Sequence, residues 1–306
     1  MHEPITYAYL ETTNYCNLHC SFCNRDDVVK KLQHMSLANW EIVLEKLKDH
    51  PISETKLMGL GEPFLHPKFS TICKMFKEYF PKAFLIVATN CQYKMNDNFK
   101  DSLKYIDLLY LSIDGYKESY EKFRPPSKWD KLINFLENLK EVERYNCKIT
   151  CNYVVNKENV NDINKIDDLC REYDLKELRL NIAQDWSEGD KLQQKEDYLW
   201  GYSDDQIKYL KQNYSKNIKG KSPWTWSDCF WVKRGIYMTV EGDLKVCALN
   251  TDTKPIGNIF KDEAVNILNS QRMIQIREGC KNNNPDTHCV NCSYKELSPL
   301  LEKLIT

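Results

Sequence analysis

Residues 5–24 read ITYAYLETTNYCNLHCSFCN and join a strand pattern directly to a cysteine-rich loop. β-Branched and aromatic residues across Ile5–Thr12 predict a β-strand. The loop then spaces Cys16, Cys20 and Cys23 as Cys-x3-Cys-x2-Cys. This spacing would also align three side chains on one helix face, but too few apolar residues lie between them for a core helix. Three thiolates in one loop suit a [4Fe–4S] cluster whose fourth iron stays open to a small molecule.

Strand and helix patterns alternate from this segment to residue 182. The predicted strands are Ile5–Thr12, Lys56–Met58, Phe84–Thr89, Leu108–Asp114, Ile149–Val155 and Glu177–Ile182. The predicted helices are Leu37–Lys48, capped by Ser36, then Phe69–Tyr79, Asn98–Leu103, Trp129–Arg144 and Val160–Tyr173. Six βα repeats predict an α/β fold with a parallel sheet, either doubly wound or curled into a partial (β/α)6 barrel.

Polar residues share one face of the last three of these strands. They are Tyr110, Ser112 and Asp114 in the fourth strand, Thr150 and Asn152 in the fifth, and Arg179 and Asn181 in the sixth. A parallel sheet is normally covered on both faces. We therefore expect these side chains to line a polar interior that receives a charged cosubstrate, rather than to face solvent.

The remainder of the chain predicts two further regions. Residues 184–222 are polar and charged and read as a linker or insertion with one helix, Ser203–Lys216. A hairpin follows, with strands Trp231–Val240 and Leu244–Cys247 around a Glu-Gly-Asp turn. A short helix at Asp262–Asn269 and a loop-rich end complete the prediction. We expect a barrel domain at 1–183, the linker at 184–222 and an auxiliary domain at 223–306.

Composition excludes several classes of protein. The chain has 306 residues, 42% of them hydrophobic and 28% charged, which indicates a folded globular protein. Its 43 basic and 44 acidic residues give a net charge of −1, which argues against a nucleic-acid or anionic-lipid partner. No secretory signal or membrane span is apparent. We expect a cytoplasmic protein, in which 13 cysteines indicate metal or redox chemistry rather than disulfides.

A second group of cysteines lies near the other end of the chain. It reads Cys229-x12-Gly242-x4-Cys247, then Cys280, then Cys289-x2-Cys292. Thiolates suit zinc as well as iron–sulfur clusters, so this spacing alone also fits a zinc ribbon. A zinc-stabilised binding module is therefore the alternative to an enzyme.

The first cysteine loop resembles the signature of the radical S-adenosylmethionine (SAM) enzymes, in which an aromatic residue, here Phe22, precedes the last cysteine. Met58-Gly59-Leu60-Gly61-Glu62-Pro63 resembles the GGEP segment of that family, with Leu60 in place of the first glycine. Thr89-Asn90-Cys91 and Ser112-Ile113-Asp114-Gly115 resemble its segments at the ends of the third and fourth strands. The resemblance implies that the cluster ligands are Cys16, Cys20 and Cys23. The SAM-binding residues predicted from the resemblance and the polar face are Phe22, Gly61, Glu62, Pro63, Thr89, Asn90, Ser112, Asp114, Asn152 and Asn181.

The second group resembles the SPASM extension of these enzymes, or its shorter form, the twitch domain. The resemblance implies one auxiliary [4Fe–4S] cluster, with Cys229, Cys247, Cys289 and Cys292 as ligands. It leaves Cys280 over, either as an alternative ligand or as a free thiol.

The resemblance implies an enzyme that reductively cleaves SAM to a 5′-deoxyadenosyl radical and abstracts a hydrogen atom from a substrate. We expect an oxidoreductase or epimerase that acts on a small molecule such as a sugar or aminocyclitol. This expectation follows because the predicted barrel begins near residue 5, with no leader-binding domain expected ahead of it. The alternative is a maturase that modifies a ribosomal peptide or a protein side chain, by a thioether or carbon–carbon crosslink, formylglycine formation or epimerisation.

The predicted reactions each need one further group. Oxidation needs a proton acceptor, for which Arg179 is a candidate, and epimerisation needs a thiol that returns a hydrogen atom, for which Cys280 and Cys91 are candidates. Reductive cleavage of SAM needs an electron donor, and we expect a flavodoxin- or ferredoxin-type partner.

Overall fold

The computed structural model describes residues 4–184, 201–220, 225–248, 254–285, 287–290 and 292–305. In this part of the chain the strands form one sheet of ten, in the order β10-β9-β8-β1-β2-β3-β4-β5-β6-β7. The strands are β1 (Tyr7–Leu10), β2 (Glu54–Lys56), β3 (Phe84–Thr89), β4 (Leu108–Ser112), β5 (Lys148–Val155), β6 (Leu178–Ile182), β7 (Ile218–Lys219), β8 (Gly235–Met238), β9 (Asp243–Lys245) and β10 (Gly257–Asn258).

The helices alternate with the strands as far as β6 and then cluster near the end of the chain. They are α1 (Arg25–Val28), α2 (Leu37–Leu47), α3 (Phe69–Tyr79), α4 (Asp97–Ser102), α5 (Glu118–Phe123), α6 (Trp129–Lys140), α7 (Ile163–Glu172), α9 (Asp204–Tyr214), α10 (Phe230–Arg234), α11 (Ala264–Leu268), α12 (Gln271–Lys281), α13 (Thr287–Val290) and α14 (Ser293–Ile305). No helix among the described residues is long and apolar enough to cross a membrane.

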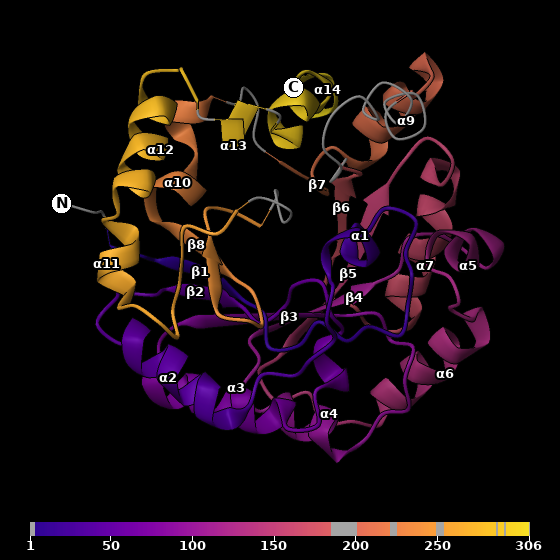
Figure 1. Cartoon of the computed structure of the whole chain (residues 1–306). Coiled ribbons are helices and arrows are strands. Elements are labelled where there is room, and N and C mark those ends of the chain that lie inside the picture. Colours follow the sequence, from indigo (N-terminus) through magenta and orange to yellow (C-terminus); the bar gives the residue numbers. More distant parts are fainter. Residues whose placement is uncertain are drawn as a thin grey trace.

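The predicted α/β fold with a partial barrel is confirmed. Strands β1 to β6 pair in parallel with their neighbours. Helices α2, α3, α4, α6 and α7 lie along the outer side of the curved sheet (Figure 1). The edge strands β7 and β10 do not pair with each other in the described part of the chain, so the barrel is open.

Helix α2 shows why the local sequence folds as predicted. The Ser36 side chain accepts a hydrogen bond from the Asn39 N–H at 3.1 Å and so caps the helix. Its buried residues recur at helical spacing, namely Trp40, Val43, Leu44 and Leu47. The Trp40 indole then donates to the carbonyl of Ile72 in α3 at 3.2 Å, which fixes α2 against its neighbour.

The predicted alternation of faces in β4 to β6 is also present. Leu109, Cys151 and Leu180 are buried in the apolar core under the outer helices. On the opposite face, the sheet register places Ser112 beside Asn152 and Asn152 beside Arg179. The polar residues of the three strands therefore gather on the inner face of the sheet, as expected.

The C-terminal hairpin extends the same sheet at the β1 edge. Strand β8 pairs in parallel with β1, from Tyr7 beside Gly235 to Leu10 beside Met238, and β9 returns antiparallel to β8. Gly242 takes the turn at φ +82°, a backbone conformation that favours glycine. The division into domains at 1–183, 184–222 and 223–306 stays a prediction, but a strand from the third region completes the sheet of the first.

Two predictions for the third region are wrong. Trp231–Val240 was expected as one strand, but its first residues belong to helix α10. The Lys233 N–H donates to the Cys229 carbonyl at 3.3 Å and closes a helical turn there, in which Trp231 packs on Tyr7 and Tyr9 while Val232 enters a separate apolar cluster. The chain after residue 269 was expected to be loop-rich, but it contains α12 and α14.

Helix α12 has an N-terminal cap and a narrow stripe of apolar residues. These are enough to form a helix because α12 packs against α10. Ser270 caps it by accepting from the Met273 N–H at 3.3 Å. Met273, Ile276 and Cys280 are buried along one side. Three buried residues give a weak periodic signal in the sequence, so the helix was missed.

The linker is partly described. Helix α9 confirms the predicted helix, and Ser203 with Gln206 forms a capping box at its start. Residues 185–200 and 221–222 of the predicted linker lie outside the described residues. After α9, strand β7 pairs with β6, and α14 packs against α9. The C-terminal helices α10, α12, α13 and α14 extend across the open side of the barrel, from the side of β8 toward β7 (Figure 1).

Candidate functional site

The first cysteine loop, Cys16–Cys23, leaves the carboxyl end of β1 without forming a helix. Backbone hydrogen bonds attach it to the end of α5 and the segment that follows, since the Ser21 N–H donates to Phe123 O at 3.0 Å and the His19 N–H to Pro125 O at 2.6 Å. The loop thus lies at the carboxyl edge of the parallel strands, where such sheets place their ligands. The helical interpretation of the cysteine spacing is thereby excluded.

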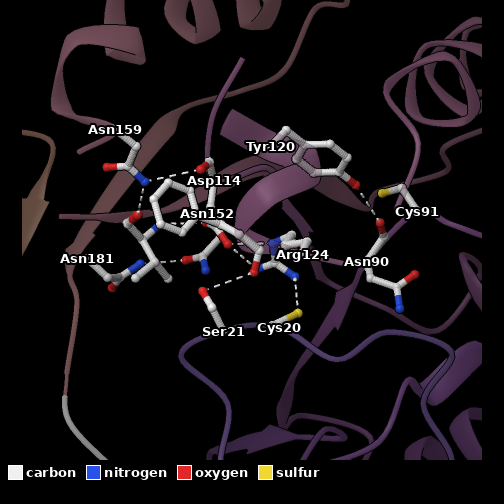
Figure 2. A network of polar contacts seen from close by, with 12 residues as sticks. Cys20, Ser21, Asn90, Cys91, Asp114, Tyr120, Arg124, Asn152, Asn159 and Asn181 are labelled. Carbon is white, nitrogen blue, oxygen red and sulfur yellow. Dashed lines mark hydrogen bonds and ion pairs between the residues drawn. The ribbon is translucent and has the colours of Figure 1, made fainter. Parts of the chain in front are cut away.

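Arg124 brings a fixed positive charge to this loop. Its guanidinium pairs with the buried Asp114 through Nε and Nη2, while Nη1 points to the sulfur of Cys20 at 3.7 Å (Figure 2). The same guanidinium lies 5.4 Å from the ring centroid of Phe22. Burial raises the pKa of the Cys20 thiol to about 11, and the Arg124 charge opposes that rise. Arg124 therefore offsets part of the cost that burial imposes on a thiolate at Cys20.

Arg124 is not among the residues predicted from the sequence, and Asp114 is predicted there to bind SAM. In the structure Asp114 is fully buried, and besides Arg124 it accepts a hydrogen bond from the Val154 N–H at 2.6 Å. Its carboxylate therefore acts on the site by holding Arg124. The sequence carries no signal that singles out Arg124, because other charged residues such as Glu121, Lys122 and Lys128 lie close to it in the chain.

Asn90 connects the end of β3 to the same loop. Its side-chain amide donates to Asn17 Oδ1 at 2.8 Å and points to Cys16 Sγ at 3.9 Å. Its backbone N–H donates to Glu62 Oε2 at 2.7 Å. The predicted residues Asn90 and Glu62 are thus brought together with Cys16.

Glu62 is buried and ties the loop after β2 to the end of β3. Its carboxylate accepts from the Thr89 hydroxyl at 2.9 Å as well as from Asn90, and Pro63 follows it in a buried 3-10 turn. Burial raises its pKa to about 7, which the hydrogen bonds from Asn90 and Thr89 oppose. The Glu62 carboxylate is therefore hydrogen-bonded by Thr89 and Asn90, and these contacts hold the loop after β2 in position.

Leu60 stands in place of the first glycine of the GGEP segment, and the geometry of the loop explains why a side chain fits there. A Cβ on Gly61 would lie 2.2 Å from the carbonyl oxygen of Thr13, and a Cβ on Gly59 would lie 2.5 Å from Glu11 Oε1. These two positions exclude a side chain, whereas Leu60 is only half-buried. The loop therefore keeps its glycines where the first cysteine loop and Glu11 approach it.

Glu11 was not predicted as a site residue. Its buried carboxylate accepts from the Leu60 N–H at 2.6 Å and from the Val240 N–H at 3.1 Å. Burial raises its pKa to about 7 against these hydrogen bonds. One carboxylate thus joins the loop after β2 to the C-terminal hairpin. No spacing in the sequence could have indicated this contact.

The polar inner face carries cations and tyrosines. Asn181 donates to Asn152 at 2.7 Å, and Arg179 lies 5.4 Å from the ring centroid of Tyr110. Lys56 lies 6.0 Å from the same centroid and donates to the Tyr9 hydroxyl at 2.7 Å. We call Tyr9, Lys56, Tyr110 and Arg179 the cationic–tyrosine face. Arg179 is among the site residues predicted from the sequence, whereas Lys56 is not.

The two candidate hydrogen donors are separate from this face. Cys91 is fully buried in the main apolar core, and Cys280 is buried in a smaller cluster with Val232 and Ile276. Neither residue makes a described contact with the cationic–tyrosine face. Their catalytic roles stay predictions.

The second cysteine group gathers from four parts of the chain. Cys229 precedes α10, Cys247 follows β9, Cys280 lies on α12, and Cys289 and Cys292 flank the end of α13. Cys229 interacts electrostatically with Cys292 and Cys280, and Cys289 interacts with Cys280, Cys247 and Cys229. All five thiols therefore belong to one site, including the one predicted to be left over.

The donor sets fit iron–sulfur clusters by their chemistry. The first group supplies two half-buried thiols and the exposed Cys23, with Arg124 beside it to offset negative charge. The second group supplies four half-buried thiols and the buried Cys280. A polynuclear cluster spreads its ligands over several iron atoms, so thiols brought from several segments of the chain suit it.

Comparison with protein families identifies both parts of the chain. A model of the radical SAM superfamily matches residues 10–170, and a model of the SPASM iron–sulfur cluster-binding domain matches residues 229–293. The chain is 22% identical over 300 residues to the sporulation killing factor maturation protein SkfB of Bacillus subtilis, covering 89% of this chain and 67% of the relative. It is 20% identical over 278 residues to the antilisterial bacteriocin subtilosin biosynthesis protein AlbA of the same organism, covering 86% of this chain and 59% of the relative.

Solved structures share the fold. SuiB of Streptococcus suis bound to S-adenosylmethionine superposes with a TM-score of 0.68 at 16% identity, covering 95% of this chain and 71% of that one. The anSMEcpe structure with bound AdoMet gives 0.68 at 18% identity, with coverages of 96% and 95%. BtrN in complex with AdoMet and 2-DOIA gives 0.56 at 15% identity, with coverages of 95% and 94%. The radical SAM family model matches more than half of this chain, and the chain therefore belongs to the radical SAM superfamily. It has a SPASM domain, and its cofactors are [4Fe–4S] clusters and SAM.

Proposed function

We propose that this radical SAM enzyme abstracts a hydrogen atom from a peptide substrate. Two curated relatives are named as a maturation protein and a bacteriocin biosynthesis protein, and a structure of SuiB contains its precursor peptide SuiA. The chain spans 67% of SkfB and 59% of AlbA, so their activities are not transferred whole. The relatives favour a peptide over the small molecule expected from the sequence.

The observation that carries the chemistry is the placement of Arg124 against Cys20. When bound, the first cluster and SAM supply the 5′-deoxyadenosyl radical. The chain's own residues hold the site in shape: Arg124 favours the thiolate of Cys20, and Asn90 fixes the Cys16 side of the loop. Glu62 and Glu11 hold the loop after β2 at its two ends.

The cationic–tyrosine face is the surface we assign to the substrate. Lys56 and Arg179 both lie against Tyr110, and no carboxylate pairs with either of them within the residues that the structure describes. Glu54, on the same side of β2, interacts with Tyr7. Half-buried cations without anionic partners favour a ligand that carries carbonyl or carboxylate oxygens. A peptide backbone, or an acidic side chain within it, supplies these groups.

The chemistry is tested by anaerobic reconstitution with iron and sulfide, followed by reduction with dithionite in the presence of SAM. We expect 5′-deoxyadenosine from the wild type and none from the variant in which Cys16, Cys20 and Cys23 are all alanine. Cys147→Ala removes a thiol outside both cysteine groups and should keep the activity. Cleavage of SAM by the triple variant would contradict the assignment of the first cluster.

The substrate class is tested by isotope transfer. Cells of the source organism are grown in deuterated medium, and their extract is separated by size into a peptide fraction and a small-metabolite fraction. Each fraction is incubated with the reduced enzyme and unlabelled SAM, and 5′-deoxyadenosine is analysed by mass spectrometry. Deuterium arriving only from the peptide fraction supports the proposal. Deuterium arriving only from small metabolites overturns it.

A small-molecule substrate remains the second candidate because of BtrN. That structure contains 2-DOIA, and its fold is covered over 94% of its length by this chain. The same isotope experiment decides between the two classes. With unlabelled substrate, loss of two mass units would then indicate oxidation, and uptake of deuterium from heavy water would indicate epimerisation.

A further inference from the structure

The second cysteine group contains one thiol more than a single cubane cluster uses. A [4Fe–4S] cluster is usually held by four cysteines. The structure gathers five, because Cys280 is 2% exposed and packs beside Cys229 and Cys289 in the apolar cluster of the C-terminal region. The fifth thiol is therefore within the site.

Within this site, Cys280 is a direct neighbour of Cys289. The two thiols are in hydrogen-bond contact, and both interact electrostatically with Cys229. Because their sulfur atoms are neighbours, exchanging one for the other moves the point of attachment by about one sulfur–sulfur contact. The remaining ligands predicted for this cluster, Cys229, Cys247 and Cys292, keep their places in such an exchange.

Cys280 and Cys289 lie on helices of different length. Cys280 lies on the eleven-residue helix α12, which Ser270 caps and Met273 and Ile276 fasten to the apolar cluster. Cys289 lies on α13, a helix of four residues. A short helix of this kind has little stability of its own. Cys280 thus offers the better anchored thiol of the pair.

We propose that Cys280 and Cys289 are interchangeable ligands for one iron of the auxiliary cluster. When Cys289 is the ligand, its sulfur accepts a hydrogen bond from the protonated Cys280. In the exchange the bond from iron to the Cys289 sulfur breaks and the bond to the Cys280 sulfur forms. The proton of Cys280 passes along the hydrogen bond to Cys289, so charge balances and no electron is transferred.

The test uses the full chain with Cys16, Cys20 and Cys23 replaced by alanine, so that the auxiliary cluster is the only one present. Cys280→Ala, Cys289→Ala and the double variant are reconstituted anaerobically, and bound iron and sulfide are measured. We expect both single variants to keep about four irons per chain and the double variant to lose them. Cys292→Ala is the matched control from the same Cys-x2-Cys pair, and it should lose the cluster by itself.

Spectra provide a second readout that does not depend on activity. The electron paramagnetic resonance spectrum of the reduced cluster should change more in Cys289→Ala than in Cys280→Ala, because the first variant changes an iron ligand whereas the second removes only a hydrogen bond to a ligand sulfur. Far-ultraviolet circular dichroism checks that α12 is intact, and serine variants replace the alanine variants if helix content falls. Loss of the cluster in either single variant, or its retention in the double variant, would overturn the proposal.

Discussion

Arg124 is the residue on which the geometry of the first site depends most. It is 7% exposed, it pairs with the fully buried Asp114, and it reaches Cys20 from a position 104 residues away in the chain. Breaking a buried ion pair leaves one charge without compensation, which costs far more than the pair contributes as a whole. A double-mutant cycle can therefore measure the coupling energy between Asp114 and Arg124.

We expect Arg124→Gln to lower the free energy of unfolding by about 3–5 kcal/mol, because Asp114 is left buried and unpaired. The double variant Asp114→Asn/Arg124→Gln should lose clearly less than the sum of the two single losses. Urea unfolding under anaerobic conditions measures these energies. Arg171→Gln breaks exposed pairs on α7 and should change stability by at most about 1 kcal/mol. Additive losses at positions 114 and 124 would show that the pair is not coupled.

Glu11 makes the stability of the protein depend on pH. Burial raises its pKa to about 7 in the folded state, above the ordinary value of a glutamate in the unfolded chain. The stabilisation of the folded state by the neutral carboxyl is therefore complete below about pH 4.3 and is lost as the pH rises to about 7. Glu62 has the same shift and adds to the same slope.

We expect Glu11→Gln to remove about half of the loss of stability between pH 5 and pH 8, a difference of about 2–3 kcal/mol. Urea unfolding at a series of pH values measures the slope. Glu41→Gln changes an exposed glutamate on α2 and should leave the slope as in the wild type. Parallel slopes for the wild type and Glu11→Gln would mean that Glu11 does not titrate in this range.

At the scale of elements, helix caps made the local predictions accurate. Ser36 and Ser203 stand where the helices α2 and α9 begin, and each accepts a backbone N–H as a cap should. Helix α12 has the same kind of cap in Ser270 but only three buried residues along its length. Its partner surface comes from α10, which the sequence does not place beside it. The cap alone was too weak a signal.

The loop after β2 depends on the absence of a side chain at one position. We expect Gly61→Ala to push this loop away from the carbonyl of Thr13, since the added Cβ would lie 2.2 Å from that oxygen. Formation of 5′-deoxyadenosine should fall about a hundredfold, because a displacement of about 1 Å is enough to misplace reacting groups. Equilibrium dialysis with SAM should show weaker binding as well. Leu60→Ala is the control in the same loop and should keep activity within a few-fold of the wild type. Normal SAM binding by Gly61→Ala would contradict this account.

At the scale of the whole molecule, the C-terminal region is built into the sheet of the barrel. Strand β8 pairs with β1 along its length, Glu11 accepts a hydrogen bond from Val240, and α14 packs on α9. The β1 edge is thus covered by β8, which prevents that edge from pairing with other chains. Residues of β8, β9, α11 and α14 belong to the main apolar core of the barrel, whereas the second cysteine group lies at the smaller cluster.

This shared core predicts that the two regions unfold together. Met238→Ala in β8 removes a fully buried side chain and should cost about 2–4 kcal/mol. We expect one urea transition, shifted equally in circular dichroism and in tryptophan fluorescence. Val265→Ala, at a residue that is 56% exposed on α11, should shift it little. A separate early transition in Met238→Ala would show that the hairpin unfolds independently of the barrel.

The sequence by itself determined the alternation of strands and helices, the position of β3 to the residue, and the two groups of thiols. These features are local, because hydrophobic period, capping and ligand spacing act over a few neighbouring residues. They were sufficient to predict the family and its cofactors.

The tertiary structure decided which distant residues meet. It placed Arg124 on Cys20, Glu11 between the loop after β2 and Val240, and Cys280 beside Cys289. A lone charged residue or an odd cysteine carries no period and no spacing that could reveal its partner. Such contacts arise only when folding buries the groups together, because a buried charge or polar atom must then find a partner within reach.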